Sequence, residues 1–448
     1  MKKDSHAPTR GSWGSSIGFI LASAGAAVGL GNIQRFPYVV SQHGGGAFVL
    51  LYLFCVVLLA LPLMLVEFAL GRHTQRNPMC AIDSIKPKGP WKYAGLLTIL
   101  TAFFILSYYS VIGGWTLGYI VGTVSGSNMV LKEFASDPVH VFSYMALFVL
   151  IVAFVVSRGV KKGIERYSKV FMPLLLLLLI FLVIRSVTLD DAGIGLEYYL
   201  KPDFSKINGT SFIFALSQAF FSLCIGEAVL VTYGSYSSKK ENLFSSAIYI
   251  SLFDTIVALV AGMIIFPALF AFNHVGAEGI GLTFDVLPSV FQVMPFGQLF
   301  GAGFFILLAF AAVTTGIALL EIPVIYLIDA WNWKRTPAVI VVALAAFVVG
   351  IPSALSSGIS PFFTNLSIPH LKLHGFYEIM DFMWGGLGMV FGGGLLAIFV
   401  AWVWGIEKAS KELHFGSNRF GWYQPFWGVS VKYVAPFLIL CILISMLF

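Results

Sequence analysis

Long apolar stretches are the feature that most constrains how this chain can fold. Residues 141–156, 170–184 and 338–351 carry almost no charge. With its flanks each stretch reaches about 17–25 residues, the length of a membrane-spanning helix. Only 11% of the 448 residues are charged, whereas a soluble domain usually carries about 25%. The chain is therefore predicted to be an all-α integral membrane protein.

The hydropathy pattern predicts eleven spans. They are expected near residues 14–38, 45–70, 91–124, 139–157, 164–187, 209–235, 242–272, 298–329, 336–352, 376–404 and 423–447. Between the seventh and eighth spans, residues 282–294 predict a re-entrant or surface helical hairpin, because Pro288 and Pro295 interrupt any longer helix. No cleavable signal peptide precedes the first span, so this span is expected to be retained.

Lysine and arginine indicate the orientation. If the N-terminus is cytoplasmic, about 20 of these residues fall in inner segments and about five in outer ones, which is the bias that topology follows. The N-terminus is therefore expected inside and, with an odd number of spans, the C-terminus outside. The net charge of +6 lies in these short loops and is a topology signal, so nucleic acid is not expected as a partner.

Two spans contain interruptions at matching places, five spans apart. The first holds the small-residue run 25–32, and the sixth holds 222–227. Glycine permits unwound backbone, which membrane proteins tolerate only where it lines a cavity or site. Paired interruptions favour an inverted repeat with a substrate site between its halves. The alternative is that small residues only allow close helix packing; Asn32 and Glu227 beside the glycines favour the site.

Ionisable residues inside spans are each candidates for function, because burying charge in a membrane is costly. They are Arg35, Glu67, Glu227, Asp254, Glu321, Asp329 and Asp381. By depth, Arg35 and Asp381 are expected to pair on the outer side of the midplane, and Arg10 and Asp329 at the cytoplasmic edge. One pair above and one below a central site would serve as two gates; the alternative is that these are ordinary interfacial charges.

Asp254 lies midway along an apolar helix, where a carboxylate has to be neutral or paired with a cation. Oxygen ligands from Asn32 and Ser222 would suit a hard cation. Thr314 and Thr315 add adjacent hydroxyls, although hydroxyls in membrane helices usually bond their own backbone. The four cysteines have no metal-like spacing, and no nucleophile–base pair stands out, so an enzyme is not expected.

Several motifs resemble one known family. Residues 29–38 (GLGNIQRFPY), 44–48 (GGGAF), the stretch from Pro62 through Glu67 to Arg72, 115–118 (WTLG), 232–236 (TYGSY) and Thr314–Thr315 match, in order, the neurotransmitter:sodium symporter family. The short, eleven-span form is similar to its bacterial branch. The resemblance implies a LeuT-type fold in a bacterial inner membrane, formed as one domain over 1–448. Its inverted five-helix repeats would be 13–187 and 209–404, with an extra span at 421–448.

The resemblance also implies two sodium sites. The first would use the Ala27 carbonyl, Asn32, Ser222 and Asp254, completed by a substrate carboxylate. The second would use the Gly25, Val28 and Ala311 carbonyls with Thr314 and Thr315. The resemblance assigns the outer gate to Arg35 and Asp381. It assigns the inner gate to Arg10, Asp329 and Tyr236. Glu67 would cap freed amides of the sixth span.

For the substrate, the resemblance assigns its carboxylate to Tyr109 and to the amides near Leu30 and Gly31, where a half-helix N-terminus favours an anion. Phe221 would be an aromatic lid. The full set expected at the substrate is Ala26, Gly29, Leu30, Gly31, Ile105, Tyr109, Phe221, Ser222, Cys224, Glu227, Gly316 and Leu319.

Departures from the family pattern refine the expected function. Gly29 replaces the aspartate of amine-transporting relatives. Without that carboxylate the substrate is expected to supply its own, which favours amino acids over amines as substrates. Asp254 replaces a neutral amide of chloride-dependent relatives. The anion site of those relatives uses residues that match Tyr52, Gln218 and Ser222, together with a serine at the position that Ala258 occupies in this chain. Chloride independence is therefore expected. A protonatable Asp254 is a weaker basis for proton antiport.

Glu227 replaces an apolar residue, and two roles remain open for it. It could bind a cationic or donor-bearing substrate side chain, or cap freed amides. Gln34 replaces a tryptophan, for which we have no account beyond an altered outer vestibule. The sequence thus predicts a sodium-coupled amino acid symporter in a lipid bilayer, working by alternating access. A proton-driven carrier, or a channel or sensor on the same scaffold, is the alternative. The particular amino acid, the sodium stoichiometry and the oligomeric state are not specified.

Overall fold

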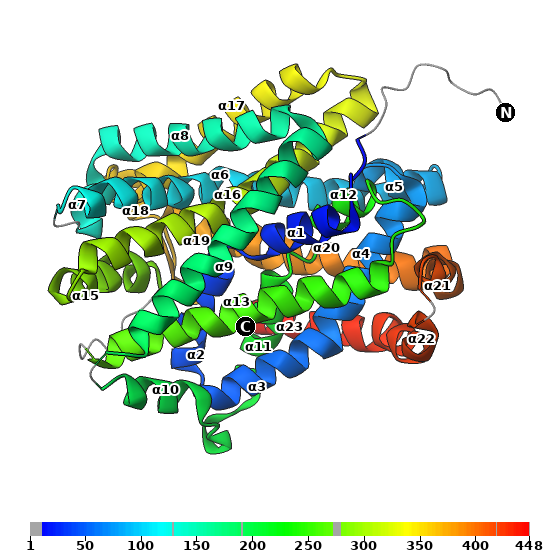
Figure 1. Cartoon of the computed structure of the whole chain (residues 1–448). Coiled ribbons are helices and arrows are strands. Elements are labelled where there is room, and N and C mark those ends of the chain that lie inside the picture. Colours follow the sequence, from blue (N-terminus) through cyan, green and yellow to red (C-terminus); the bar gives the residue numbers. More distant parts are fainter. Residues whose placement is uncertain (1–10, 128–129, 190, 272–278, 418, 448) are drawn as a thin grey trace.

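The computed structural model describes residues 11–127, 130–189, 191–271, 279–417 and 419–447. Within these residues the protein is a bundle of long helices that run roughly along one direction (Figure 1). In the described part of the chain, nine helices are long and apolar enough to cross a membrane. They are Gly46–Thr74, Lys92–Val124, Pro138–Ser157, Val160–Ser186, Leu243–Ala271, Gly297–Trp331, Arg335–Leu355, Gly375–His414 and Phe420–Leu447.

A tenth span is broken near its middle. Helix α1 (Ser16–Ala27) ends at Val28, whose backbone is extended, and a π-helical turn (Gly31–Arg35) then leads into α2 (Phe36–Gln42). The two parts are bent by 52°. The predicted interruption of the first span is therefore present as a break centred on Val28 and Gly29.

The sixth predicted span is broken in a different way. Helix α11 (Gly209–Ser222) stops, and α12 (Val229–Gly234) begins only after six residues without regular helix. Cys224, Gly226 and Ala228 in this segment all have positive φ, at 51°, 84° and 63°. Alternating left-handed residues cannot continue a right-handed helix. With this pair counted as one span, the described residues reach the eleven spans that were predicted.

Several spans are assembled from consecutive α and π segments. The second joins α3 (Gly46–Cys55), a π turn (Val56–Ala60) and α4 (Leu61–Thr74), and the fifth joins a π turn (Val160–Glu165) to α9 (Arg166–Ser186). The tenth joins α19 (Gly375–Met380), a π segment (Asp381–Gly388), α20 (Met389–Ile398), a π segment (Phe399–Gly405) and α21 (Ile406–His414). The last joins α22 (Phe420–Val429), a π turn (Ser430–Val434) and α23 (Ala435–Leu447).

The two longest helices of the described chain form the centre of the bundle. Helices α6 (Lys92–Val124) and α16 (Gly297–Trp331) pack along each other, and α16 also contacts α1. The most apolar stretch of α16 is 89% buried inside the protein, against 28% for the span that contains α9. Helix α16 is therefore central, and α9 presents its apolar side chains outward, as a lipid-facing helix does.

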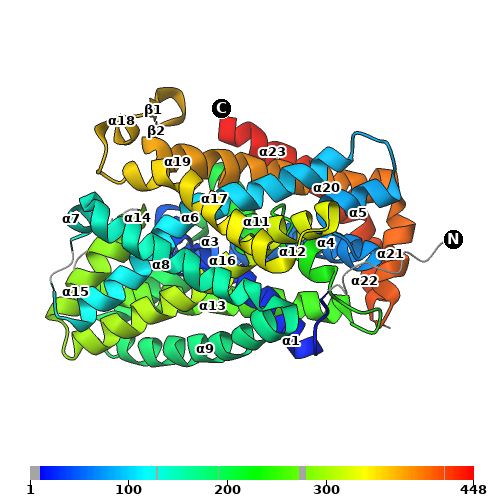
Figure 2. The ribbon, with the colours of Figure 1, turned by 90° about the horizontal axis from the view of Figure 1, so that it is seen from above.

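Helix α13 (Leu243–Ala271) packs against both α1 and the π turn that follows the first break, and α11 also contacts that turn. The remaining straight spans are α8 (Pro138–Ser157) and α17 (Arg335–Leu355), both of which contact α6. The two broken spans consequently meet in the interior, between α6, α13 and α16 (Figure 2).

Short elements cover the two ends of the bundle. At one end lie α7 (Leu131–Ser136), α10 (Ala192–Leu200), α15 (Leu287–Val293) and α18 (Pro361–Thr364), and at the other lie α5 (Pro78–Ile85), α12 and α21 (Figure 1). Other short elements are α14 (Gly279–Gly281), a π turn (Leu282–Val286), 3₁₀ turns at Phe204–Lys206 and Pro369–Leu371, and strands β1 (Ser367–Ile368) and β2 (Leu373–His374). β1 and β2 pair antiparallel.

One predicted element differs in the structure. Within the predicted segment, residues 282–293 form one helical rod, from the π turn through α15, instead of a hairpin. Pro288 lies in the first turn of α15, where its missing amide hydrogen and fixed φ are tolerated. The rod ends before Pro295 and packs on α16.

Candidate functional site

A cavity of about 590 Å³ lies where the two broken spans meet α6 and α16. Its walls come from the first break and the turns after it, α6, α11 and the second break, α14, α16, and the start of the tenth span. The lining residues are Ala27, Gly29, Leu30, Gly31, Gln34, Arg35, Tyr38, Val39, Ile105, Tyr108, Tyr109, Ile112, Phe214, Phe221, Cys224, Glu227, Ile280, Thr315, Leu319, Tyr377, Glu378 and Asp381.

Most residues expected at the substrate border this cavity, and three do not. Ala26 presents its carbonyl to the Thr315 hydroxyl, which donates at 3.0 Å. Ser222 turns its hydroxyl toward Asp254. Gly316 faces α8, since a β-carbon there would lie 3.0 Å from Phe148. The structure therefore brings nine of the twelve to the cavity wall: Gly29, Leu30, Gly31, Ile105, Tyr109, Phe221, Cys224, Glu227 and Leu319.

A fully enclosed polar cluster joins the two breaks to α13. The Asn32 amide nitrogen donates to Asp254 Oδ1 at 2.8 Å and to Ser222 Oγ at 3.0 Å. The Ser222 hydroxyl in turn donates to Asp254 Oδ2 at 2.7 Å. Asn32 and Asp254 are 0% exposed and Ser222 is 1% exposed. Three distant parts of the sequence thus meet at one buried carboxylate, that of Asp254.

Tyr52 of α3 completes this cluster from the side. Its hydroxyl lies 3.2 Å from Ser222 Oγ and 3.4 Å from Asp254 Oδ2. The other side of the cluster reaches the first break, where the Gly29 amide donates to Asn32 Oδ1 at 3.2 Å. Ala27, the remaining residue of the predicted first cation site, borders the cavity.

The residues of the predicted second cation site lie where α1 passes α16. A β-carbon on Gly25 would lie 3.3 Å from the Thr314 β-carbon, so the two backbones approach closely. The Thr314 hydroxyl donates to the carbonyls of Phe310 and Ala311, each at 3.0 Å. Val28 and Ala311 are fully buried. Thr315, in contrast, donates its hydroxyl to the Ala26 carbonyl beside the first break, and it borders the cavity.

Both predicted cation sites offer only oxygen ligands. Carboxylate, amide, hydroxyl and backbone carbonyl oxygens suit a hard cation such as sodium better than a transition metal. Among the described residues, no group of three or more histidine, cysteine or acidic side chains is arranged to hold a metal. The donor chemistry of Asp254, Ser222 and Asn32 therefore fits sodium.

Tyr109 of α6 presents its hydroxyl to the first break. The hydroxyl is buried and lies near the Thr315 hydroxyl and the Leu30 backbone, but it forms no well-aligned hydrogen bond with a described residue. A β-carbon on Gly29 would lie 3.4 Å from this hydroxyl and 2.7 Å from Thr315 Oγ1. Glycine at position 29 therefore leaves open the space between Tyr109, Thr315 and the start of the π turn at Gly31.

Glu67 of α4 reaches into the second break. The Gly226 amide donates to Glu67 Oε1 at 2.7 Å, and both groups are buried. The carboxylate thereby satisfies one of the amides that the break removes from helical hydrogen bonding. Glu67 Oε2 has no hydrogen-bond partner among the described residues.

At the end predicted to face outward, Arg35 and Asp381 both border the cavity but do not pair. Among the described residues no ion pair joins them; the Arg35 guanidinium lies 4.4 Å over the Phe221 ring, and the Tyr108 hydroxyl donates to Asp381 Oδ1 at 2.9 Å. The cavity continues past this pair to Phe214, Ile280 and Glu378.

At the opposite end of the cavity, hydrogen bonds and an ion pair hold the helices together around the start of α1. The Trp13 indole donates to the Tyr233 carbonyl at 2.9 Å, and the Gly14 amide donates to Glu165 Oε2 at 2.6 Å. Tyr236 donates to Glu321 Oε1 at 2.5 Å, and Arg335 forms an ion pair with Glu321. These bonds connect the residues just before α1, the π turn that precedes α9, the end of α12, α16 and α17.

Of the predicted inner gate, Asp329 accepts hydrogen bonds from the backbone and side chain of Asn77, at 2.9 and 3.2 Å. Arg10 lies outside the described residues. Sequence reasoning missed the roles of Arg335 and Glu165 in this region. It had flagged Glu321 as an ionisable residue within a span, and that was the one available signal.

Comparisons with known proteins agree with this geometry. The chain matches the model of the Sodium:neurotransmitter symporter family over residues 10–130 and 126–448. It is 40% identical to an uncharacterized sodium-dependent transporter, YhdH, of Bacillus subtilis, with 97% of both chains covered. It is 33% identical to an uncharacterized sodium-dependent transporter of Methanocaldococcus jannaschii, covering 90% of this chain and 84% of that one.

A solved structure is also similar over the whole fold. It is that of MhsT in complex with L-phenylalanine, which matches with a TM-score of 0.89 and 38% sequence identity. The match covers 98% of this chain and 100% of the other. The predicted LeuT-type fold is thereby confirmed.

Proposed function

The chain belongs to the sodium:neurotransmitter symporter family, whose members are sodium-dependent transporters and not enzymes, and we propose that it takes up an amino acid together with sodium by alternating access. The single observation that carries this proposal is the buried cluster of Asn32, Ser222 and Asp254. It ties both broken spans to α13 and offers oxygen ligands at the edge of the cavity.

A cation in this cluster would couple to the substrate through the backbone. Asn32 lies in the turn that follows the first break, and Ser222 is the last residue before the second. Sodium held by the side-chain oxygens of Asn32, Ser222 and Asp254 would order both breaks at once. Because the same breaks form walls of the cavity, sodium and substrate would favour the same conformation and so bind cooperatively.

An amino acid fits the end of the cavity beside the first break. The unpartnered Tyr109 hydroxyl can donate to a carboxylate, and the amides at the start of the π turn carry the partial positive charge of a helix N-terminus. Gly29 supplies no negative charge to hold a free amine. The MhsT structure, which contains L-phenylalanine, supports the same class of substrate.

Alternating access is supported by the contrast between the two ends. On the outer side Arg35 and Asp381 are separate, and the cavity continues past them. On the inner side hydrogen bonds and an ion pair connect the residues before α1, the π turn before α9, the end of α12, α16 and α17. Pairing of Arg35 with Asp381 would close the outer side. Release to the cytoplasm then requires the inner bonds to break, and inward sodium movement supplies about 2.3 kcal/mol per charge per 100 mV.

The charge already present in the cluster supports the proposal that transport is independent of chloride. The Ser222 hydroxyl donates to Asp254 Oδ2, and the Tyr52 hydroxyl lies within reach of the same atom. Gln218 donates instead to the Gly31 carbonyl at 3.1 Å, and Ala258 has no hydroxyl to offer. The donors that could hold an anion are thus directed at a fixed carboxylate or elsewhere.

The test is uptake of radiolabelled amino acids into proteoliposomes, with an inward sodium gradient or with potassium in its place, and with chloride or gluconate as the anion. We expect uptake of at least one amino acid class to require sodium and to be unaffected by the anion. Uptake that ignores sodium and follows a pH gradient would replace the proposal with a proton-driven carrier. Flux that does not saturate with substrate would favour a channel.

A further inference from the structure

Glu227 is a buried carboxylate that neither the proposed cation sites nor the proposed carboxylate site uses. It lies in the second break, between Gly226 and Ala228, which both have positive φ. Its side chain borders the cavity although the residue is only 4% exposed. Burying a carboxylate without a partner is costly, so a residue in this position needs one.

The structure separates the two roles that the sequence left open for Glu227. A cap for the broken span is already supplied by Glu67, which accepts from the Gly226 amide at 2.7 Å from the side of α4. Glu227 is directed to the cavity wall instead. The freed backbone of the break therefore does not account for the carboxylate of Glu227.

Protein donors near Glu227 are few. The Cys224 thiol lies within hydrogen-bond reach of it, and the Tyr108 and Tyr109 hydroxyls are near enough to interact electrostatically. A thiol has one hydrogen, and Cys224 directs it to the Ala26 carbonyl at 3.3 Å. Among the described cavity residues, Arg35 is the one base, and its guanidinium lies over Phe221. Within the described chain no ion pair satisfies Glu227, so the carboxylate remains available to a ligand.

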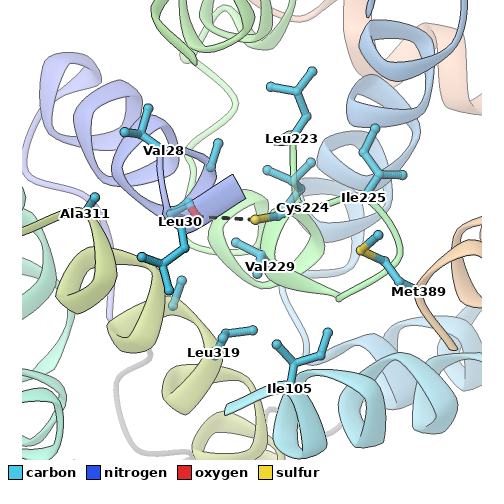
Figure 3. Packing of buried hydrophobic residues seen from close by; sticks show 14 of the residues in the cluster. Val28, Leu30, Ile105, Leu223, Cys224, Ile225, Val229, Ala311, Leu319 and Met389 are labelled. Atoms are coloured by element: carbon cyan, nitrogen blue, oxygen red, sulfur yellow. Dashed lines mark hydrogen bonds between the residues drawn. The ribbon is translucent and has the colours of Figure 1, made fainter. Parts of the chain in front are cut away.

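Aliphatic side chains share the cavity wall with Glu227, beside the Tyr108 and Tyr109 hydroxyls. Ile105 of α6, Leu319 of α16 and Leu30 beside the first break border the same cavity (Figure 3). All three are buried. Aliphatic side chains of this kind favour an apolar stem, and the carboxylate favours a positive or hydrogen-donating group at the end of that stem.

The net charge of the cavity favours a positively charged group over a neutral hydrogen-bond donor. Three carboxylates line it, Glu227, Glu378 and Asp381, against one guanidinium, Arg35. Asp381 accepts from Tyr108, and Glu378 accepts from the His374 amide at 2.7 Å. A zwitterionic amino acid adds no net charge, so a cationic side chain is the addition that balances Glu227.

We propose, resting on the function proposed above, that Glu227 is the specificity-determining residue for substrates with a cationic side chain on an apolar stem. Lysine, arginine and ornithine have this form. The α-carboxylate would lie toward Tyr109 and the first break, the stem against Ile105 and Leu319, and the ammonium or guanidinium group against Glu227. Arginine could form two parallel hydrogen bonds with the carboxylate.

The experiment measures equilibrium binding of radiolabelled amino acids to the full-length protein in sodium and in potassium. Pairs of matched shape isolate the charge: lysine against norleucine, and arginine against citrulline. We expect the wild type to bind lysine and arginine at least tenfold more tightly than their neutral partners in sodium. Glu227→Gln should reduce that ratio to about one while norleucine binding is kept. Glu197→Gln, an exposed carboxylate of α10 remote from the cavity, should leave the ratio unchanged.

The possible outcomes distinguish a failure of this inference from a failure of the proposed function. Sodium-dependent binding of neutral amino acids, with a lysine-to-norleucine ratio near one in the wild type, overturns the inference and leaves the symporter intact. A preference for neutral donors such as tryptophan or glutamine also overturns the cationic class. If no amino acid binds in a sodium-dependent way, the proposed function fails as well. Retained norleucine binding shows that the Glu227→Gln variant is folded, and so keeps its ratio interpretable.

Discussion

At the scale of single residues, function depends on carboxylates that occupy different environments within the same bundle. Asp254 receives hydrogen bonds from Asn32 and Ser222, Glu67 receives a backbone amide, and Glu227 borders the cavity. Each is nearly or fully buried. We propose separate tasks for them on the basis of these surroundings: cation binding, capping of a break, and contact with substrate.

Asp254 offers a direct residue-scale prediction. In Asp254→Ser the fixed negative charge is lost, while the hydroxyls of Tyr52 and Ser222 remain as donors. We expect sodium-driven uptake in chloride-free buffer to fall by roughly tenfold or more, which corresponds to at least about 1.4 kcal/mol. Added chloride should restore part of it by supplying the missing charge. Uptake of the variant that matches wild type without chloride would show that the charge of Asp254 is not required.

At the scale of elements, the second break depends on backbone shapes that few residues adopt. Gly226 has φ of 84°, and a β-carbon there would overlap the Met389 carbonyl oxygen and lie 2.8 Å from the Gly393 amide of α20. Gly226→Ala should therefore lose stability both through backbone strain of roughly 1–3 kcal/mol and through the overlap.

The measurement is thermal unfolding in detergent, with Gly193→Ala as the matched control. Gly193 lies in α10, and no atom within 4 Å would meet an added β-carbon there. We expect the control to unfold at or above the wild-type temperature and Gly226→Ala several degrees below it. Equal unfolding temperatures for the two variants would mean that the break relaxes freely.

Much of this element-scale architecture could be predicted from the sequence, and the reasons are physical. A span needs about 20 apolar residues and a break needs small ones, so eleven spans and both interruptions could be located by composition alone. The form of each break could not, because left-handed Cys224 and Ala228 carry no sequence signal for it. The rod at 282–293 was also missed, since Pro288 in a first turn does not stop a helix.

The site divides in the same way. Residues from the two breaks could be named because their spacing and polarity mark them, and most of those named border the cavity. The contributions of Tyr108, Tyr377 and Phe214 to the cavity wall could not be predicted from the sequence. An aromatic residue of a membrane helix that lines a cavity has the same sequence signal as one that only packs against its neighbours. The pairing of Glu321 with Arg335 joins two helices across a turn, which position in the sequence alone does not specify.

At the scale of the whole molecule, the prediction concerns which end faces the cytoplasm. The bias of lysine and arginine predicts that α5, α21 and the start of α1 are inside and α10 is outside. In a variant without native cysteines, Gly193→Cys should react with a membrane-impermeant thiol reagent added to intact cells. Lys408→Cys, an exposed position of α21, should react only after permeabilisation. The reverse pattern would invert the topology and exchange the two gates.

The central claim is that sodium and an amino acid cross the membrane together through the cluster of Asn32, Ser222 and Asp254. The most direct measurement is entry of radioactive sodium into proteoliposomes, with and without an amino acid that the protein binds, for the wild type and for Ser222→Ala. The account predicts that the amino acid accelerates sodium entry through the wild type severalfold and hardly at all through the variant. Sodium entry that the amino acid does not change in the wild type would contradict coupling.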